Sequence, residues 1–187
     1  MNLCFNCLLV IGLSLLAGCQ KTEPPKIHPY EYYLQQSSPE LIVRQLETGS
    51  KTFRPVEGNF KTVFENLIQF LKGSSDKLTP EDFSGEILAS RPWESVKFTL
   101  KSYALDGKGF KKIYVLQTRL WASGLNYPVE IDQIEVMLLL EIDGGINQPS
   151  CGATIRFKKE PHGWVVADSS IPGLSALTDG RISYILR

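Results

Sequence analysis

Hydrophobic and polar positions follow two different periods in the two halves of the chain. Between residues 38 and 73 the apolar positions recur every three or four residues, which is the spacing of one face of an α-helix. From about residue 84 to residue 171 they mostly alternate with polar positions, as in a β-strand with one buried face. The pattern predicts helices first and an antiparallel sheet afterwards, which is an α+β fold.

The helical half contains two expected helices. The first begins at Ser38, whose side chain suits a helix cap, and ends before Gly49. The second covers Phe60–Leu71, where apolar residues fall at i, i+3, i+4, i+7, i+8 and i+11. Asn59 is its expected cap and Gly73 its expected end. We expect the apolar stripe of this second helix to pack against the sheet.

The second half of the chain predicts a series of strands separated by turn residues. Ile131–Asp143 gives the clearest pattern, and its run 136–140 is apolar on both faces, so we expect a central, partly covered strand. Residues 181–187 form either a final edge strand or a docked tail. The expected strands are Ser84–Ala89 (the weakest), Val96–Ala104, Phe110–Ala122, Ile131–Asp143, Gly152–Glu160 and Trp164–Ile171.

A polar segment rich in proline precedes the helices. Residues 19–37 contain three prolines, which favour an extended tether. The aromatic cluster Tyr30–Tyr33 interrupts this polarity; we expect it to dock on the domain, with a partner-binding motif as the alternative. The sequence therefore divides into a tether over 19–37 and a single α+β domain over 38–187.

An uncharged apolar stretch stands at the start of the chain. Leu8–Ala17 has about the length of the apolar region of a signal peptide and falls short of the roughly 20 residues that a membrane-spanning helix needs. The run Leu16-Ala17-Gly18-Cys19 resembles the lipobox of bacterial lipoproteins. This resemblance implies that residues 1–18 are a signal peptide. An ordinary cleaved signal peptide, or a start upstream of the true one, is the alternative.

The same resemblance implies a lipid anchor. Cys19 would become the first residue of the mature chain and carry a diacylglycerol and an amide-linked acyl chain such as palmitate. Several acyl chains, each contributing about 0.8 kcal/mol per buried methylene, make a stable membrane anchor. Gln20 is not the aspartate that retains such proteins in the inner membrane. The expected location is therefore the outer membrane, facing the periplasm.

Charge and cysteine content narrow the function classes. Lys and Arg total 20 and Asp and Glu total 20, so no basic excess supports binding to nucleic acid. A hydrophobic fraction of 43% is typical of a globular chain. Of the 4 cysteines, two lie in the leader and Cys19 would carry lipid. Cys151 alone remains, which excludes an intramolecular disulfide in the mature chain, and we expect it to be buried and inert.

A second resemblance concerns the domain. Two N-terminal helices, long antiparallel strands and the late hairpin segment Gly163–Asp168 resemble the NTF2-like cone fold over about 40–171. The resemblance implies two N-terminal helices packed on a curved, mainly antiparallel sheet. A lipid-binding or adaptor domain of another helix-plus-sheet topology is the alternative.

Carboxylates on the expected central strand are the first candidates for chemistry. Catalytic NTF2-like domains project an acid–base pair into the cone, and Asp132, Glu135 and Glu141 lie on a strand where such a pair would sit, beside Arg119 on its neighbour. The interpretation that we favour is a set of cross-strand ion pairs on the wet face.

Other candidate side chains lack partners in the sequence. His28 and His162 have no second ligand at metal-binding spacing, and a serine-type site would have to rely on His162 with Asp168. No HExxH, GxSxG, P-loop or GxGxxG pattern occurs, so no cofactor is expected. Four aromatic residues would line an apolar pocket or pack in the core: Trp93, Trp121, Tyr103 and Tyr114.

These observations favour a non-enzymatic envelope lipoprotein. It would bind the membrane through lipid on Cys19 and act as an adaptor or accessory subunit for a protein partner of the envelope. The alternative is a domain that binds a small molecule or lipid in the hollow of a curved sheet, with weak enzymatic activity.

Overall fold

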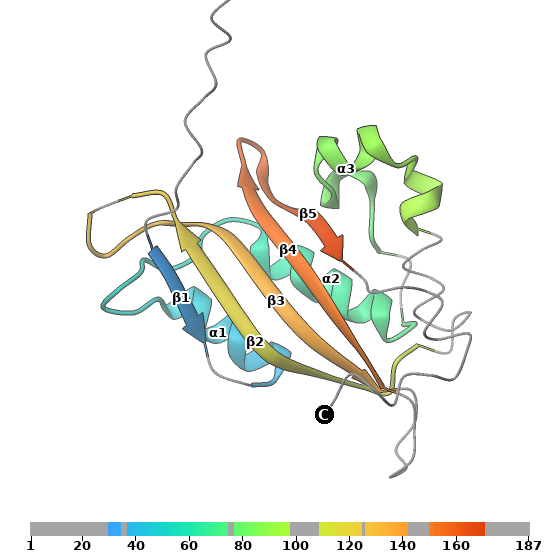
Figure 1. Cartoon of the computed structure of the whole chain (residues 1–187), viewed down its shortest axis with the longest axis horizontal. Helices are drawn as coiled ribbons and strands as arrows, with labels where there is room; N and C mark the ends of the chain where they lie inside the picture. The colour runs from blue at the N-terminus through green and yellow to red at the C-terminus, as the bar shows by residue number, and fades with distance from the viewer. Residues whose placement is uncertain are drawn as a thin grey trace, which may run out of the picture.

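A five-stranded antiparallel sheet forms the centre of the protein, and its strands follow one another in chain order (Figure 1). The computed structural model describes residues 30–34, 37–74, 77–97, 109–124, 126–141 and 150–170. The helices stand before the four longer strands, so the chain has the predicted α+β fold. The strands are β1 (Tyr30–Leu34), β2 (Lys112–Ala122), β3 (Ile131–Glu141), β4 (Ser150–Glu160) and β5 (Gly163–Ser170).

Helices α1 (Pro39–Thr48) and α2 (Phe60–Leu71) lie against one face of this sheet, behind it in the view of Figure 1. The cap predicted for α1 is confirmed, because the Ser38 hydroxyl accepts a hydrogen bond from the Leu41 N–H at 3.3 Å. The helix ends at Gly49, which has a φ of 70° that favours glycine. α1 contacts β2 and α2 contacts β5, so the two helices cover opposite sides of the same sheet face.

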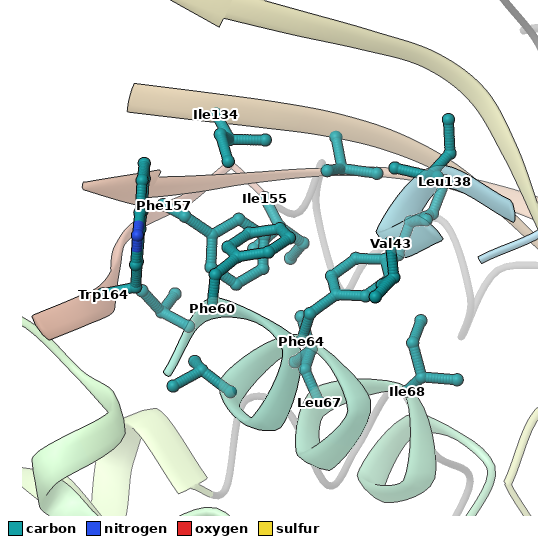
Figure 2. Close-up of a cluster of buried hydrophobic side chains, with 14 of the residues drawn as sticks. Val43, Phe60, Phe64, Leu67, Ile68, Ile134, Leu138, Ile155, Phe157 and Trp164 are labelled. Carbon is teal, nitrogen blue, oxygen red and sulfur yellow. The ribbon is translucent and has the colours of Figure 1, made fainter. Parts of the chain in front are cut away.

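The apolar stripe of α2 packs into the core, as its spacing predicts (Figure 2). The Phe60 ring meets the Phe157 ring edge-on at 5.3 Å and the Trp164 ring at 5.5 Å. Phe64 meets Phe157 in the same manner at 5.8 Å. Edge-to-face contacts of this kind add to the gain from burying the rings. Aromatic side chains therefore fill the space between α2 and the sheet.

Asn59 stands at the N-cap position of α2, as predicted, but its side chain makes no capping hydrogen bond there. Its Oδ1 accepts a hydrogen bond from the Trp164 N–H at 2.6 Å, and its Nδ2 donates to the Trp164 carbonyl at 3.2 Å. A Cβ at Gly163, where φ is 127°, would lie 2.5 Å from the Asn59 Oδ1. The Asn59 side chain thus makes the two backbone hydrogen bonds that a neighbouring strand would make. It links the start of α2 to the start of β5.

One expected strand is helical instead, and so are the first two residues of another. Gly85–Ser90 forms the short helix α3, and the Ser84 hydroxyl caps it by accepting from the Ile87 N–H at 3.3 Å. Residues 93–97 are also helical, with the Val96 N–H bonded to the Pro92 carbonyl at 3.1 Å. In both places a capping serine or a proline at the first turn outweighs a short alternating pattern. The remainder of the expected strand Val96–Ala104 lies outside the described residues.

β1 falls within the range 19–37, whose prolines predict a tether. It pairs with the end of β2, from Tyr30 opposite Ala122 to Leu34 opposite Thr118. The tyrosine cluster of this range therefore supplies an edge strand of the sheet. The expected signal peptide, Cys19, His28 and Tyr103 lie outside the described residues, as do residues 172–187.

Candidate interaction site on the open face of the sheet

The face of the sheet opposite α1 and α2, turned toward the viewer in Figure 1, carries no helix within the described part of the chain. We call it the open face. One residue from every strand falls in a single line across it. Tyr33 pairs with Arg119, Arg119 with Glu135, Glu135 with Arg156, and Arg156 with Asp168. We call these five residues the charged row.

Each pair of neighbours in the charged row is in contact. The Arg156 Nη2 donates a hydrogen bond to the Glu135 Oε2 at 3.0 Å, and the Arg119 Nη1 lies 3.5 Å from the Glu135 Oε1. The Arg156 Nη1 lies 3.8 Å from the Asp168 Oδ2. At the other end, the Arg119 guanidinium stands over the Tyr33 ring, 5.7 Å from its centre, as in a cation–π contact.

Glu135 is the central member of the row. It is 8% exposed, whereas 39% of the Arg119 side chain and 44% of the Arg156 side chain are exposed. A nearly buried carboxylate is costly unless charged partners and hydrogen bonds compensate for the lost water. Two guanidinium groups supply that compensation here, so Glu135 holds both arginines against the sheet.

Extra residues in two strands decide which side chains reach the open face. The β2–β3 register shifts between Val115 and Gln117, which makes Leu116 an extra residue in β2. The β4–β5 register shifts beside Arg156, and the extra residue in β5 is Ala167. A shift of one residue exchanges the two faces of a strand. Without these bulges, Arg119 and Asp168 would stand opposite core residues, on the sheet face that α1 and α2 cover.

Three further lines of residues flank the charged row on the same face. Most of these side chains are half-buried, and Tyr114 is 39% exposed. At Gly152 a Cβ would meet no described atom closer than the Leu138 carbonyl oxygen at 4.0 Å. The absence of a side chain therefore leaves the surface of the sheet recessed at this position. The lines are Trp121–Gln133–Lys158–Val165, Gln117–Met137–Thr154 and Tyr114–Leu139–Gly152.

Only one of the predicted carboxylates joins Arg119. The expected cross-strand ion pair between Arg119 and Glu135 is confirmed. Glu141 lies six positions further along β3, about 20 Å away at the rise of a strand, and pairs in register with Lys112. Asp132 is the extra residue where the β3 register shifts again, and stands outside the row. The three carboxylates therefore do not converge on one point.

The other candidate side chains are dispersed. His162 lies in the exposed turn between β4 and β5, whereas Asp168 pairs with Arg156. Trp93 packs against Phe83, with ring centres 5.1 Å apart, while Trp121 and Tyr114 belong to the open face. The backbone of Cys151 lies in β4 opposite Leu140. The structure therefore joins neither His162 with Asp168 nor the described aromatic residues in one pocket.

An open groove of about 450 Å³ lies between α1 and α2. Its floor contains Val43, Phe64 and Ile68, and its rim carries charges of both signs, including Glu40 and Lys72. A backbone hydrogen bond at the start of α1, the Ser38 hydroxyl and the charge of Lys72 lower the pKa of Glu40 below its usual value.

Comparison of the chain with protein-family models, with curated proteins and with solved structures finds no match. In residues 30–170, as far as they are described, no helix has the length and apolarity that crossing a bilayer requires. The same residues contain no cluster of three or more His, Cys, Asp or Glu side chains arranged to hold a metal ion.

Proposed function

We propose that this protein is a membrane-anchored envelope lipoprotein that acts as a non-enzymatic adaptor or accessory subunit of an envelope assembly, and that it binds its protein partner in that assembly through its open face. The observation that carries the proposal is the charged row, which crosses all five strands on a face without a helix. Arginine and tyrosine, which stand at positions 119, 156 and 33, are enriched at protein interfaces.

The contacts within the row support recognition of a protein surface. Each arginine is already held by Glu135, so binding would immobilise little additional side-chain freedom. Alternating charges favour one alignment of a partner over others. Trp121, Met137 and Leu139 in the flanking lines add apolar area that a partner would remove from water.

The proposed anchor would keep this surface near the membrane. Cys19 precedes Tyr30 by eleven residues, which span at most about 40 Å when extended. β1 follows this segment directly and contributes Tyr33 to the charged row. A lipid on Cys19 would thus hold the open face within a short distance of the bilayer and raise its local concentration toward other envelope proteins.

The alternative function is binding of a small molecule or lipid by an NTF2-like cone. The helices on one sheet face and the Gly163–Trp164 hairpin support that topology, and the groove of about 450 Å³ between α1 and α2 is a place where a ligand would fit. The aromatic side chains between α2 and the sheet fill the space that such a cone reserves for its ligand. The adaptor role is therefore the better supported of the two.

Two variants test the proposal in a bacterial host with an outer membrane, using the tagged full chain. Cys19→Ala should move the protein from the membrane fraction to the soluble fraction. Arg156→Glu should leave it in the membrane and remove envelope proteins that cross-link to the wild type, because it places a second carboxylate beside Glu135. Lys51→Glu, the same charge change at an exposed position beyond α1, is the control.

Either half of the proposal can fail separately. Unchanged membrane retention of Cys19→Ala would refute the lipid anchor. An unchanged set of cross-linked proteins for Arg156→Glu, or an equal loss for Lys51→Glu, would refute binding through the open face.

A further inference from the structure

The order of charges along the row is complementary to the same order reversed. From β2 to β5 the signs run plus, minus, plus, minus, at Arg119, Glu135, Arg156 and Asp168. Reversed, the order is minus, plus, minus, plus. We propose that the open face binds a second copy of this chain, face to face, about a twofold axis that runs along the strands between β3 and β4. This inference names a partner for the surface invoked in the proposed function and rests on that use of the surface.

Such an axis places opposite charges against each other. It brings β2 over β5 of the second copy and β3 over β4 of the second copy. Arg119 then faces the partner's Asp168, and Glu135 faces the partner's Arg156. Both contacts occur twice because a twofold interface uses the same patch on each copy.

The flanking lines match under the same rotation. Leu139 faces the partner's Gly152, where the missing side chain leaves room for it. In the next line, Trp121 faces the partner's Val165, which is only 7% exposed and so leaves room for the larger ring above it. Stacked sheets lie about 10 Å apart with interdigitating side chains, and they tolerate a relative rotation near 30°. Leucine against glycine and tryptophan against valine suit that spacing.

Apolar contact and charge have different parts in this pairing. Within one copy, each charge of the row already has a neighbour of opposite sign, so the additional ionic attraction is modest. The charges mainly fix the alignment, because a displacement by one strand would set like charges against each other. Removal of Trp121, Met137 and Leu139 from water supplies the attraction.

The direction of the axis agrees with a shared membrane. Rotation about an axis parallel to the strands keeps the direction of every strand. Both copies of β1 therefore begin at the same end of the pair, and both segments preceding Tyr30 leave from that end. Two copies anchored in one bilayer can associate in this way. The row contains two positive and two negative groups, so it offers no net charge to attract a polyanion.

Mixing of charge variants tests this arrangement. Full-length chains with two different tags are co-expressed, extracted in mild detergent, and one tag is captured while the other is quantified. When both copies carry Asp168→Arg, Arg119 of each copy faces an arginine at position 168 of the other. When both copies carry Arg119→Asp, the aspartate at position 119 of each copy faces Asp168 of the other. Asp168→Arg mixed with Arg119→Asp restores opposite charges at both contacts.

We expect capture of the second tag to fall at least about ten-fold for each variant paired with itself and to return to near the wild-type level in the mixture. The mixture contains the same altered chains, so a folding defect cannot produce its recovery. Glu47→Arg, on α1, should capture like the wild type. Failure of the mixture to recover would overturn the inference. Equal capture for all pairs would also overturn it, because membership of one micelle would then explain the wild-type signal.

The two proposals fail in different ways. If the mixture does not recover while Arg156→Glu still loses other envelope proteins, the open face binds a different protein. If neither experiment changes binding, the open face is not an interaction surface.

Discussion

The Arg156 guanidinium donates a hydrogen bond of 3.0 Å to the Glu135 carboxylate across the β3–β4 boundary, and the second oxygen of that carboxylate faces Arg119. Glu135 is nearly buried between its two partners. The charged row therefore depends on one carboxylate for its geometry. Its members lie far apart along the chain, and the sheet register alone brings them together.

Glu135→Ala should destabilise the protein by about 1–3 kcal/mol, because two guanidinium groups lose the charge that compensates for their partial burial. Urea unfolding followed by circular dichroism measures the change. Glu47→Ala removes an exposed carboxylate 3.7 Å from Lys61 and should cost no more than about 0.5 kcal/mol. Equal costs for the two variants would contradict the central position of Glu135.

Asn59→Ala should cost about 1–3 kcal/mol, because it leaves the N–H and the carbonyl of the buried Trp164 without the partner that Asn59 supplies. Asn59→Ser separates this bridge from helix capping, since serine is a good cap but is too short to reach both Trp164 groups. We expect Asn59→Ser to be nearly as unstable as Asn59→Ala in thermal unfolding. Wild-type stability of Asn59→Ser would indicate that capping is what matters.

Thr118→Val should leave the free energy of unfolding unchanged or raise it by up to about 1 kcal/mol. Thr118 is fully buried on the core side of β2, and its hydroxyl has no hydrogen-bond partner among the described residues. Valine has nearly the same shape and no group that needs water. Thr62→Val, on the exposed side of α2, is the control and should change stability by less than about 0.5 kcal/mol. A loss of more than about 1 kcal/mol for Thr118→Val would reveal a bonded hydroxyl.

Acid should weaken the contact between Glu130 and Lys159. The hydrogen bond and the charge of Lys159 hold the pKa of Glu130 below its usual 4.5. A lowered pKa in the folded state adds stability that is complete above pH 4.5 and is lost as the pH falls through that lower value. The pair is exposed, so the effect should stay below about 1 kcal/mol.

Urea midpoints measured between pH 7 and pH 3 for the wild type and for Glu130→Gln test this pair. The difference between the two proteins should shrink as the pH falls. Parallel curves over the whole range would show that the contact contributes nothing to stability.

Long periodic segments of this chain could be predicted from the sequence because they satisfy one period over many residues. Phe60–Leu71 keeps helical spacing over three turns, and β3 keeps alternation from Ile134 to Glu141. Ser84–Ala89 is too short for its period to decide, and the capping hydroxyl of Ser84 makes it helical. Asn59 has the residue type of a cap, but its side chain forms hydrogen bonds with the Trp164 backbone instead.

The charged row could be predicted from the sequence only in part. Arg119 and Glu135 lie on strands adjacent in the chain, which suggests their pairing, but the face on which Arg119 stands depends on the extra residue Leu116. Arg156 and Asp168 require the register of β4 and β5, which depends on a single extra residue, Ala167. Tyr33 lies in a segment whose prolines and polar residues favour a tether rather than a strand. Bulge positions depend on packing across the sheet, which local sequence does not determine.

The open face as an interaction surface is tested most directly by site-specific photo-cross-linking of the full chain in the bacterial envelope. A photoreactive amino acid replaces Thr154, which lies on the open face in β4, or Gln45, which is exposed on α1 beyond the other sheet face. We predict cross-linked protein adducts, among them one of twice the mass of the chain, from position 154 and none from position 45. Adducts from position 45 alone, or from neither position, would contradict the assignment of the open face.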